Sequence, residues 1–509
     1  MDYLFYIQTF KKDRSNNPRF KNRDGEFFVL TEDSWNDHGY ETTFWLDYWK
    51  DRSFHNIGLI RILNRDNNIT RSVIPAQFKS LTEDYISLGY NEELYKYAVK
   101  ILGKERAKEI LTKLNDISLT GLEGNQYFNL EDKGIQDSFF RSSEGRFVYS
   151  EVRNKYFLNI ESQDRDYNFI FKAHLYKDSK EFKDINIDFR KKGDLPNRLF
   201  TIIGKNGVGK TRLLNQLAES LFDSSKPENK NRFDSIEKTS MNELDDNIPI
   251  YNKIIAISFS VFDKFYKGSL DNEKESEDQT KFNNYTYIGL HKVDNSIYSS
   301  DDLIKLNKRA YQKIVEKNRT KLFVDAVNHS NILNFEIDEH FDYETFFKEI
   351  FSSGQSIFIS MLCRLLSEIE DGSLIFLDEP ELYLHPNAIA SLAKIYYGIL
   401  EKFKSYAILC THSPILVQEI PSMYVRKLNM LDKNTIIYER PNIETFGTNI
   451  SDITADIFNV LDRESLYRSK LKEWVNEKNL SEEEILMQFD DRLSFKTQLY
   501  LASLCKERD

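Results

Sequence analysis

Cysteine is scarce in this sequence: a chain of 509 residues contains three, at Cys363, Cys410 and Cys505. Three thiols are too few for a disulfide framework, and their spacing does not match that of a metal site. We therefore expect reduced thiols and a cytoplasmic protein. The first residues also lack the basic segment and the apolar segment of a secretion signal, which agrees with this expectation.

Long hydrophobic runs and an excess of basic residues are also missing. No apolar run reaches the roughly 18 residues that a membrane helix needs, so we expect no membrane span. The chain carries 70 Lys and Arg against 81 Asp and Glu, which gives a formal net charge of −11. Any contact with a nucleic acid must therefore come from a local patch or from a partner protein.

Hydrophobic residues make up 40% of the chain and charged residues 30%, as in a globular protein. Strand-like runs and then a helical pattern at Asn91–Asp116 predict an N-terminal α+β domain over residues 1–120. Residues 121–164 are expected to form a connector, and 450–509 a helical C-terminal region. Residues 165–449 alternate strands and helices, which is typical of an α/β core with a mixed, largely parallel sheet.

Three segments interrupt the predicted core. Polar stretches near 224–247 and 267–284 predict insertions. Residues 301–350 predict a helical segment, whose first helix is expected at Leu303–Val327. That helix carries a basic series at Lys305, Lys308, Arg309, Lys313, Lys317 and Lys321. Such a stripe could meet a nucleic acid or an acidic partner, but a solvated helix face is the preferred interpretation because acidic residues interrupt it.

A glycine-rich loop between a predicted strand and a predicted helix gives the strongest chemical signal. It is a complete GxxxxGK[ST] motif, formed by Gly204, Lys205, Asn206, Gly207, Val208, Gly209, Lys210 and Thr211. Its N–H groups can face phosphate oxygens at the start of the following helix. Lys210 is expected to reach the β- and γ-phosphates of ATP, and Thr211 to ligate Mg²⁺. A chance glycine turn is the alternative, which the flanking strand and helix disfavour.

Two further strands are predicted to end in polar residues. An apolar strand runs into Asp378, which could hold Mg²⁺ through water, and Glu379, which could polarise the attacking water. A solvated strand end is the alternative, and the intact phosphate loop upstream weakens it. His412 ends the next strand and could contact a γ-phosphate, although a lone histidine is usually structural.

A helix start lies between these motifs in the chain. Ser352, Ser353, Gly354 and Gln355 open an apolar helix, and Ser352 with the free N–H groups could form a second anion site. The alternative is an ordinary serine cap. Taken by itself, this helix start favours the cap, which is common. The order of phosphate loop, serine-capped helix, Asp-Glu strand and His strand is nevertheless hard to obtain by chance.

In this order the motifs resemble those of ABC-type ATPases over about residues 165–440. The resemblance implies a Walker A loop at 204–211, a signature helix at 351–355 that includes Ser352, Gly354 and Gln355, and a Walker B strand at 374–379. It implies His412 as the switch histidine, and Glu379, His412 and Lys210 as catalytic groups. It further implies a Mg²⁺-dependent ATPase that acts as a homodimer or higher homo-oligomer, because Walker A of one subunit faces the signature serine of another.

The Glu-Pro-Glu-Leu-Tyr-Leu-His-Pro run at 379–386 and the Thr-His-Ser-Pro run at 411–414 resemble the OLD and RecF-like branch. The layout is most similar to the PtuA ATPases of Septu and retron-associated antiphage defence, and the ATPase of the PARIS system is close. This resemblance implies control of a separate effector such as an HNH nuclease. A RecF-like repair ATPase without a toxic partner is the alternative. A transporter motor and a non-catalytic scaffold are disfavoured.

The sequence departs from the family pattern at two places. The usual Q-loop glutamine is not evident after the strand at 254–259, where Ser258, Ser260 and Asp263 stand instead. Ser353 occupies a position where the signature usually has glycine. About 95 residues follow Pro414, without an obvious metal-binding set of carboxylates. We therefore expect no nuclease domain of the OLD type in this chain.

Overall fold

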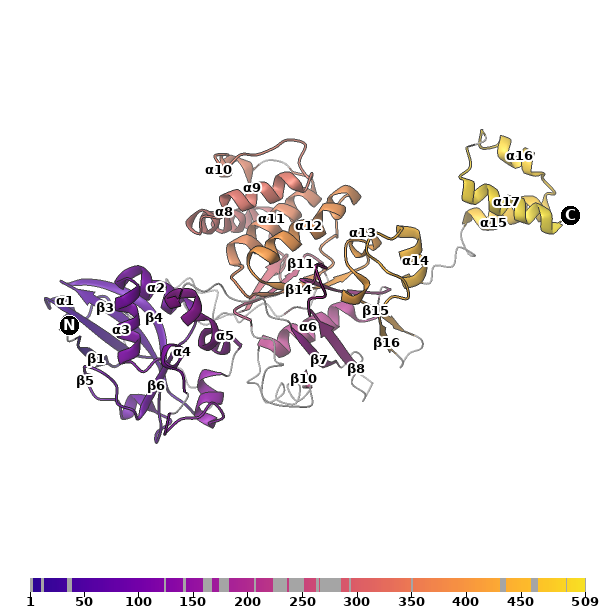
Figure 1. The fold of residues 1–509 in the computed structure, drawn as a ribbon. Coiled ribbons are helices and arrows are strands. Elements are labelled where there is room, and N and C mark those ends of the chain that lie inside the picture. Colours follow the sequence, from indigo (N-terminus) through magenta and orange to yellow (C-terminus); the bar gives the residue numbers. More distant parts are fainter. Residues whose placement is uncertain are drawn as a thin grey trace.

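The computed structural model describes most of the chain (Figure 1). The described ranges are 3–10, 13–33, 39–122, 125–140, 143–158, 167–173, 183–205, 207–222, 236–237, 251–261, 265, 285–292, 294–348, 351–430, 436–458, 466–490 and 492–508. Asn206, Asp263 and nearly all of the predicted insertions at 224–247 and 267–284 lie outside them. Among the described helices, none combines the length and the apolar character that crossing a bilayer requires.

The N-terminal unit is built on a mixed sheet with the strand order β5-β1-β2-β3-β4-β6. Its strands are β1 (Phe5–Gln8), β2 (Glu26–Glu32), β3 (Thr43–Lys50), β4 (Ser53–Asn64), β5 (Gln77–Phe78) and β6 (Tyr85–Gly89). β1 runs parallel to β2, and the other neighbours are antiparallel. The short helix α1 (Pro18–Lys21) and the 3₁₀ turn Thr70–Ser72 belong to the same region.

The helix predicted at Asn91–Asp116 is two helices, α2 (Glu92–Leu102) and α3 (Lys104–Lys113). They meet at Gly103, whose φ of 81° only glycine adopts readily. Apolar residues continue at helical spacing on both sides, so the periodicity alone does not reveal the break.

The structure differs from the connector predicted at 121–164. Its described part contains the helix α5 (Ser143–Val152) and π-helical turns at 135–139 and 153–158, and α4 (Ile117–Thr120) precedes it. These segments place buried side chains in the same hydrophobic core as the N-terminal strands, including Leu122, Ile135, Phe139, Val148 and Phe157. The N-terminal core therefore extends to Phe157.

The second unit contains a sheet with the order β12-β11-β13-β14-β9-β15-β16 among the described strands. Its strands are β9 (Leu199–Ile203), β11 (Ile254–Ser258), β12 (Tyr285–Gly289), β13 (Leu374–Asp378), β14 (Tyr406–Thr411), β15 (Val425–Met430) and β16 (Ile436–Glu439). All neighbours are parallel except β15 and β16. The predicted α/β class with a mixed, largely parallel sheet is confirmed. A separate antiparallel sheet joins β10 (Ile236–Glu237), β7 (Asn168–Ala173) and β8 (Lys183–Asp188).

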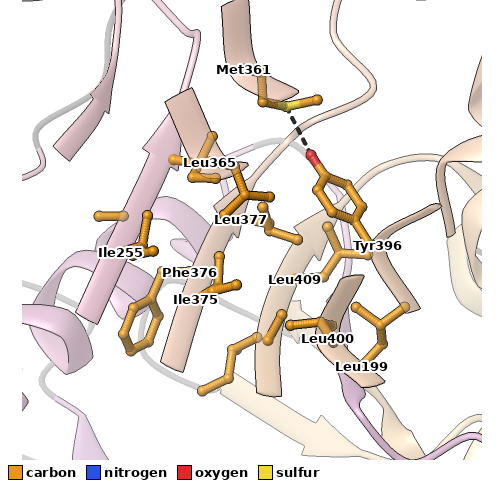
Figure 2. Packing of buried hydrophobic residues seen from close by; sticks show 14 of the residues in the cluster. Leu199, Ile255, Met361, Leu365, Ile375, Phe376, Leu377, Tyr396, Leu400 and Leu409 are labelled. Carbon is orange, nitrogen blue, oxygen red and sulfur yellow. Dashed lines mark hydrogen bonds between the residues drawn. The ribbon is translucent and has the colours of Figure 1, made fainter. Parts of the chain in front are cut away.

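Helices pack against the parallel sheet and bury its central strands. They include α6 (Lys210–Phe222), α11 (Ser353–Glu368), α12 (Pro386–Lys402) and the short α13 (Pro414–Val417). Figure 2 shows side chains of β11, β13 and β14 packed against Met361, Leu365 and Tyr396 from the helices, with the Tyr396 hydroxyl 2.8 Å from Sδ of Met361. The five residues of β13 are all buried, as expected for a strand covered on both faces.

The helix predicted at Leu303–Val327 is also split, into α8 (Ser300–Glu316) and α9 (Thr320–His329). Asn318, between them, has a φ of 54°, a left-handed conformation that ends the first helix. Three residues of the basic series form ion pairs within the chain: Lys308 with Glu344, Lys313 with Glu368, and Lys317 with Glu370. These pairs favour a structural role for the stripe. The small α10 (Tyr343–Phe346) follows.

The C-terminal region is helical in its described parts, as predicted. α14 (Ile450–Phe458) contributes Ile453 and Ile457 to the core of the parallel-sheet unit. The helices α15 (Leu466–Lys472), α16 (Glu482–Met487) and α17 (Phe495–Arg508), with a π-helical turn at 473–477, form a separate cluster (Figure 1). Its buried residues are Leu471, Val475, Ile485, Leu501 and Leu504.

Candidate active site

The predicted residues of the phosphate loop, of the Asp-Glu strand and His412 gather where three neighbouring parallel strands end. β14 lies between β9 and β13, and all three run in the same direction. The glycine-rich loop follows β9, Asp378 ends β13, and His412 follows β14. The carboxyl edge of a parallel sheet is the usual place for a ligand in α/β proteins.

Lys210 begins α6 and turns its side chain back into the loop. Its Nζ donates to the carbonyl oxygens of Gly204 and Lys205, at 3.1 and 3.3 Å. The residue is 4% exposed, and burial lowers the pKa of the Lys210 ammonium. Within the described part of the chain, it has no carboxylate at ion-pair distance. A buried cation held mainly by carbonyl dipoles is a suitable partner for an anionic phosphate.

The loop itself is shaped for close approach of a ligand. Gly207 has a φ of 81°, and a Cβ placed there would meet no atom within 4 Å, so this side of the loop is open. Gly204 is needed for packing instead, because a Cβ there would lie 2.1 Å from the carbonyl oxygen of Leu428. Val208 is buried in the core and the Lys205 side chain is exposed. Their predicted contribution to phosphate binding is therefore through main-chain N–H groups and not through their side chains.

Thr211 and Asp378 form a pair of oxygen ligands beside the loop. The Thr211 hydroxyl donates to Oδ1 of Asp378 at 3.1 Å, and Asp378 is 2% exposed. Hydroxyl and carboxylate oxygens are the hard ligands that Mg²⁺ prefers. The donor set and the buried Lys210 thus fit ATP with Mg²⁺, which when bound would supply the phosphoanhydride to be cleaved and a cation to balance its charge.

Glu379 and His412 lie in direct contact next to Lys210. Nε2 of His412 is 2.7 Å from Oε1 of Glu379 and 2.7 Å from Nζ of Lys210. The hydrogen bond with His412 lowers the pKa of Glu379, against the opposing effect of burial. Glu379 adopts a φ of 46°, rare for a residue with a side chain and often found at functional sites. The sharp turn directs its carboxylate toward His412.

Ser258 and Ser260 are described residues in the region of the expected Q-loop. Ser258 pairs in register with Asp378 on the neighbouring strand, and its hydroxyl accepts a hydrogen bond from the Ser260 N–H at 3.4 Å. Its place at the carboxyl edge makes the Ser258 hydroxyl a further oxygen that could contact a metal-bound water. Tyr287 hydroxyl donates to the Ser258 carbonyl, at 3.4 Å.

The predicted signature residues form a local cap at the start of α11. The Ser352 hydroxyl accepts from the Gln355 N–H at 3.3 Å, and Oε1 of Gln355 accepts from the Ser352 N–H at 2.9 Å. Gln355 also donates to the Ile332 carbonyl. Among the described hydrogen bonds, none joins these residues to the phosphate loop. Ser352 remains exposed at the helix start. The cap uses the N–H groups of Ser352 and Gln355, so those of Ser353 and Gly354 are the ones that could face an anion.

Gly354 has a packing role that the motif does not reveal. A Cβ at this position would lie 2.3 Å from the carbonyl oxygen of Tyr383. Tyr383 belongs to the turn after β13 and has a φ of 70°. The start of α11 therefore rests directly on the turn that carries Glu379.

Glu381 is a residue that the motif analysis of the sequence missed. Its Oε1 accepts from the hydroxyl of Thr411 and from the N–H of His412, the latter at 2.9 Å. The only signal in the sequence is its place in the Glu-Pro-Glu run, two residues after Glu379. Nothing in that spacing indicates that the side chain reaches the neighbouring strand.

Comparisons with known proteins found similarities to a family model, to a phage protein and to solved structures. Residues 199–418 match a family model described as "AAA domain, putative AbiEii toxin, Type IV TA system". Protein ea59 of Escherichia phage lambda is 26% identical over 521 aligned residues, covering 94% of this chain and 95% of that protein. Among solved structures, cbiO1 from Clostridium perfringens, part of the ABC transporter complex cbiONQ, shares 16% identity with a TM-score of 0.27, covering 64% of this chain and all of cbiO1.

The matched range contains the phosphate loop, the start of α11, the Asp-Glu strand and His412. These elements follow one another in the chain and, apart from the start of α11, end at one edge of a parallel sheet. The described core is thus an α/β unit with a P-loop, and its predicted motifs lie within the matched range.

Proposed function

We propose that this chain binds ATP with Mg²⁺ and hydrolyses it at the carboxyl edge of the parallel sheet. The observation that supports this most directly is the convergence of Lys210, Thr211, Asp378, Glu379 and His412 from three strands. Each side chain has the chemistry that one part of phosphoryl transfer to water requires.

Each of the converging side chains has a separate proposed role. Lys210 binds the β- and γ-phosphates, while Thr211 and Asp378 hold the metal directly or through water. Glu379 orients the attacking water and accepts its proton, and its lowered pKa keeps it ionised at neutral pH. His412 lies between Lys210 and Glu379, where it can contact the terminal phosphate. This contact would be lost when the phosphate is cleaved and released.

The proposed assembly is a head-to-tail homodimer or a higher homo-oligomer. Ser352 and Ser353 are exposed at the start of α11, and the described hydrogen bonds of Ser352 stay within the cap. A second copy could bring its phosphate loop against this helix start. Each ATP would then be bound by Lys210 of one chain and Ser352 of the other.

At the level of biology, we propose that ATP turnover controls a separate effector, such as an HNH nuclease, in bacterial antiphage defence. The sequence resemblance to defence ATPases supports this, and the matched family model carries the name of a toxin from a toxin–antitoxin system. The relative in phage lambda shows that similar chains also occur in a phage. A RecF-like repair ATPase without a toxic partner is the competing function.

The first test is ATP hydrolysis by the purified chain with Mg²⁺ and after chelation by EDTA. Lys210→Ala should weaken ATP binding about 10–100-fold, since a charge-assisted contact is worth roughly 1.5–3 kcal/mol. Lys402→Ala, at the exposed end of α12, is the matched control and should behave as the unchanged protein. Unaltered ATP affinity of Lys210→Ala in calorimetry would contradict the proposed site.

The second test separates an effector partner from an activity of this chain. The purified chain, incubated with plasmid DNA, ATP and Mg²⁺ or Mn²⁺, should leave the DNA uncut. Cleavage that persists in Lys210→Ala after repurification would place a nuclease in this chain. Protection of cells against phage by this gene with its neighbours, lost in Lys210→Ala, would favour defence over repair.

A further inference from the structure

Glu381 links two strands of the site through one carboxylate oxygen. It follows β13 in the turn that contains Glu379, whereas its two hydrogen-bond donors, the Thr411 hydroxyl and the His412 N–H, belong to the end of β14. The side chain therefore crosses from the turn after one strand to the loop after the next. Within the described contacts, it is the side chain that joins this turn to the main chain of His412.

The linkage continues beyond His412. The Thr411 hydroxyl, which donates to Glu381, accepts a hydrogen bond from the Ser413 N–H at 2.8 Å. The Ser413 hydroxyl in turn accepts from the Leu416 N–H at the start of α13, at 3.4 Å. The main chain on both sides of His412 is thereby tied, directly or through one hydroxyl, to Glu381.

The position of His412 matters because its ring contacts two charged groups at once. Nε2 is 2.7 Å from both Glu379 Oε1 and Lys210 Nζ. A shift of the His412 main chain by a fraction of an ångström would change both distances. The rate of a reaction falls steeply when a group that takes part in it is displaced by such amounts.

A stabilising role alone does not account for this carboxylate. Oε2 of Glu381 is buried and has no hydrogen-bond partner among the described residues, an arrangement that costs stability. Burial also raises the pKa of Glu381, so its charged form is disfavoured there. Burial of Glu381 is unfavourable, and yet the residue lies against the His412 loop. A role in positioning His412 explains this better than a role in stability.

We propose that Glu381 is a positioning residue that fixes the His412 ring between Glu379 and Lys210, and that ATP turnover depends on the two hydrogen bonds accepted by its Oε1. The proposal rests on the ATPase function proposed above. Glu381 itself does not contact the nucleotide in this account, and it acts through the acceptor oxygen rather than through its charge.

The experiment compares five variants by kcat, KM for ATP and ATP affinity in calorimetry. Glu381→Leu removes the acceptor and should lower kcat about 10–100-fold, the order expected for a displaced catalytic group, with ATP affinity within about threefold. Glu381→Gln keeps an acceptor oxygen without the charge and should recover most of the turnover. Glu401→Leu, exposed on α12, is the matched control and should equal the unchanged protein.

Thr411→Val tests the same linkage from the other side and leaves Glu381 in place. It removes one donor, so its loss of kcat should be smaller than that of Glu381→Leu. The double variant should lose little more than Glu381→Leu alone, because the two changes break one network. This variant and Glu381→Gln also decide the matter if Glu381→Leu does not fold.

Two outcomes would overturn the proposal. Full turnover in Glu381→Leu, in a protein whose unchanged form hydrolyses ATP, would show that His412 is positioned without Glu381. Equal inactivity of Glu381→Gln and Glu381→Leu would show that the negative charge is required, as for a base or a metal ligand. Absence of ATP hydrolysis by the unchanged protein would instead refute the proposed function, so the two failures are distinguishable.

Discussion

Glu379 combines an unusual backbone conformation with a carboxylate that is held in contact with a ring nitrogen of His412. Glu379→Gln preserves the shape and one acceptor oxygen but cannot take a proton. We expect this variant to bind ATP normally and to hydrolyse it roughly 10²–10⁴-fold more slowly, the usual effect of losing a general base. Single-turnover hydrolysis together with calorimetric ATP binding measures the two effects separately. Normal turnover would place the base elsewhere.

At this scale the sequence predicted the residues whose roles depend on a short motif. Lys210 and Thr211 are fixed by the spacing of the glycine-rich loop, and Asp378 and Glu379 by the end of an apolar strand. Glu381 could not be predicted in this way, because its hydrogen bonds reach residues about thirty positions away. The adjacency of β13 and β14 creates that contact, and no local pattern records it.

The contact between α11 and the turn after β13 connects two elements of the site. Gly354 allows the helix start to rest on the carbonyl of Tyr383, because an added Cβ would lie 2.3 Å from that oxygen. Gly354→Ala should therefore displace the turn or the helix, with a cost of about 1–3 kcal/mol. We expect a lower thermal midpoint and slower ATP turnover, since the same turn carries Glu379.

Gly398→Ala provides the matched control for this prediction. Gly398 lies within α12, and a Cβ there would meet no atom within 4 Å. Alanine should stabilise the helix by about 0.5–1 kcal/mol, since glycine is a poor helix former. Equal thermal midpoints for Gly354→Ala and Gly398→Ala would show that the helix–turn contact is not tight.

Helices and strands could be predicted where the hydrophobic periodicity is strong. The ends of these elements were harder to predict. The strands β9, β11, β13 and β14 match apolar runs in the sequence, as their complete burial requires. The breaks at Gly103 and Asn318 were missed, since the apolar spacing continues across each of them. A single left-handed residue redirects the chain without altering the pattern on either side.

The N-terminal unit meets the parallel-sheet unit at the edge opposite the candidate site. Lys155 lies 2.6 Å from Oε1 of Glu92 and 2.6 Å from Oδ2 of Asp371, and Asn252 donates to Oε2 of Glu92 at 2.6 Å. Asn252 precedes β11 and Asp371 precedes β13, so the junction lies at the amino ends of these strands. The junction thus lies away from the carboxyl ends, where the nucleotide and the second subunit are proposed to bind.

The N-terminal unit buries carboxyl groups whose protonation should make its stability depend on pH. Burial raises the pKa of Glu144 to about 8, that of Asp47 to about 7 and that of Asp116 to about 6. The folded state therefore binds more protons than the unfolded chain between about pH 4 and pH 8. Stability of this unit should fall as the pH rises through that window.

Glu144→Gln tests this dependence, because glutamine resembles the protonated carboxyl. It should remove one contribution to the slope, up to about 1.4 kcal/mol per pH unit for one proton, leaving that of Asp47 and Asp116. Hydrogen exchange of α5 between pH 5 and pH 8 measures the slope. Glu105→Gln, exposed on α3, is the control. An unchanged slope in Glu144→Gln would mean that this carboxyl ionises in the folded state as it does in the unfolded chain.

Assembly of two chains is the property of the whole molecule on which the proposed activity depends most. Ser352 is exposed, so Ser352→Arg alters the helix start without filling the core, and it should abolish hydrolysis by blocking the partner's nucleotide. It also removes a helix cap, which costs about 0.5–2 kcal/mol. Ser299→Arg removes the equivalent capping box of α8 and should keep full activity, which separates capping from the proposed role.

Mixing Lys210→Ala with Ser352→Arg chains tests whether the sites are shared between subunits. In a mixed head-to-tail dimer, one site carries both defects and the other carries none. With random pairing, half of the dimers are mixed and half of their sites are intact, so about a quarter of the normal activity should return if sites act independently. Each variant alone should remain inactive. If the two chains are shown to co-assemble and no hydrolysis returns, independent shared sites are ruled out, and Ser352 must act within its own chain or both sites must act together.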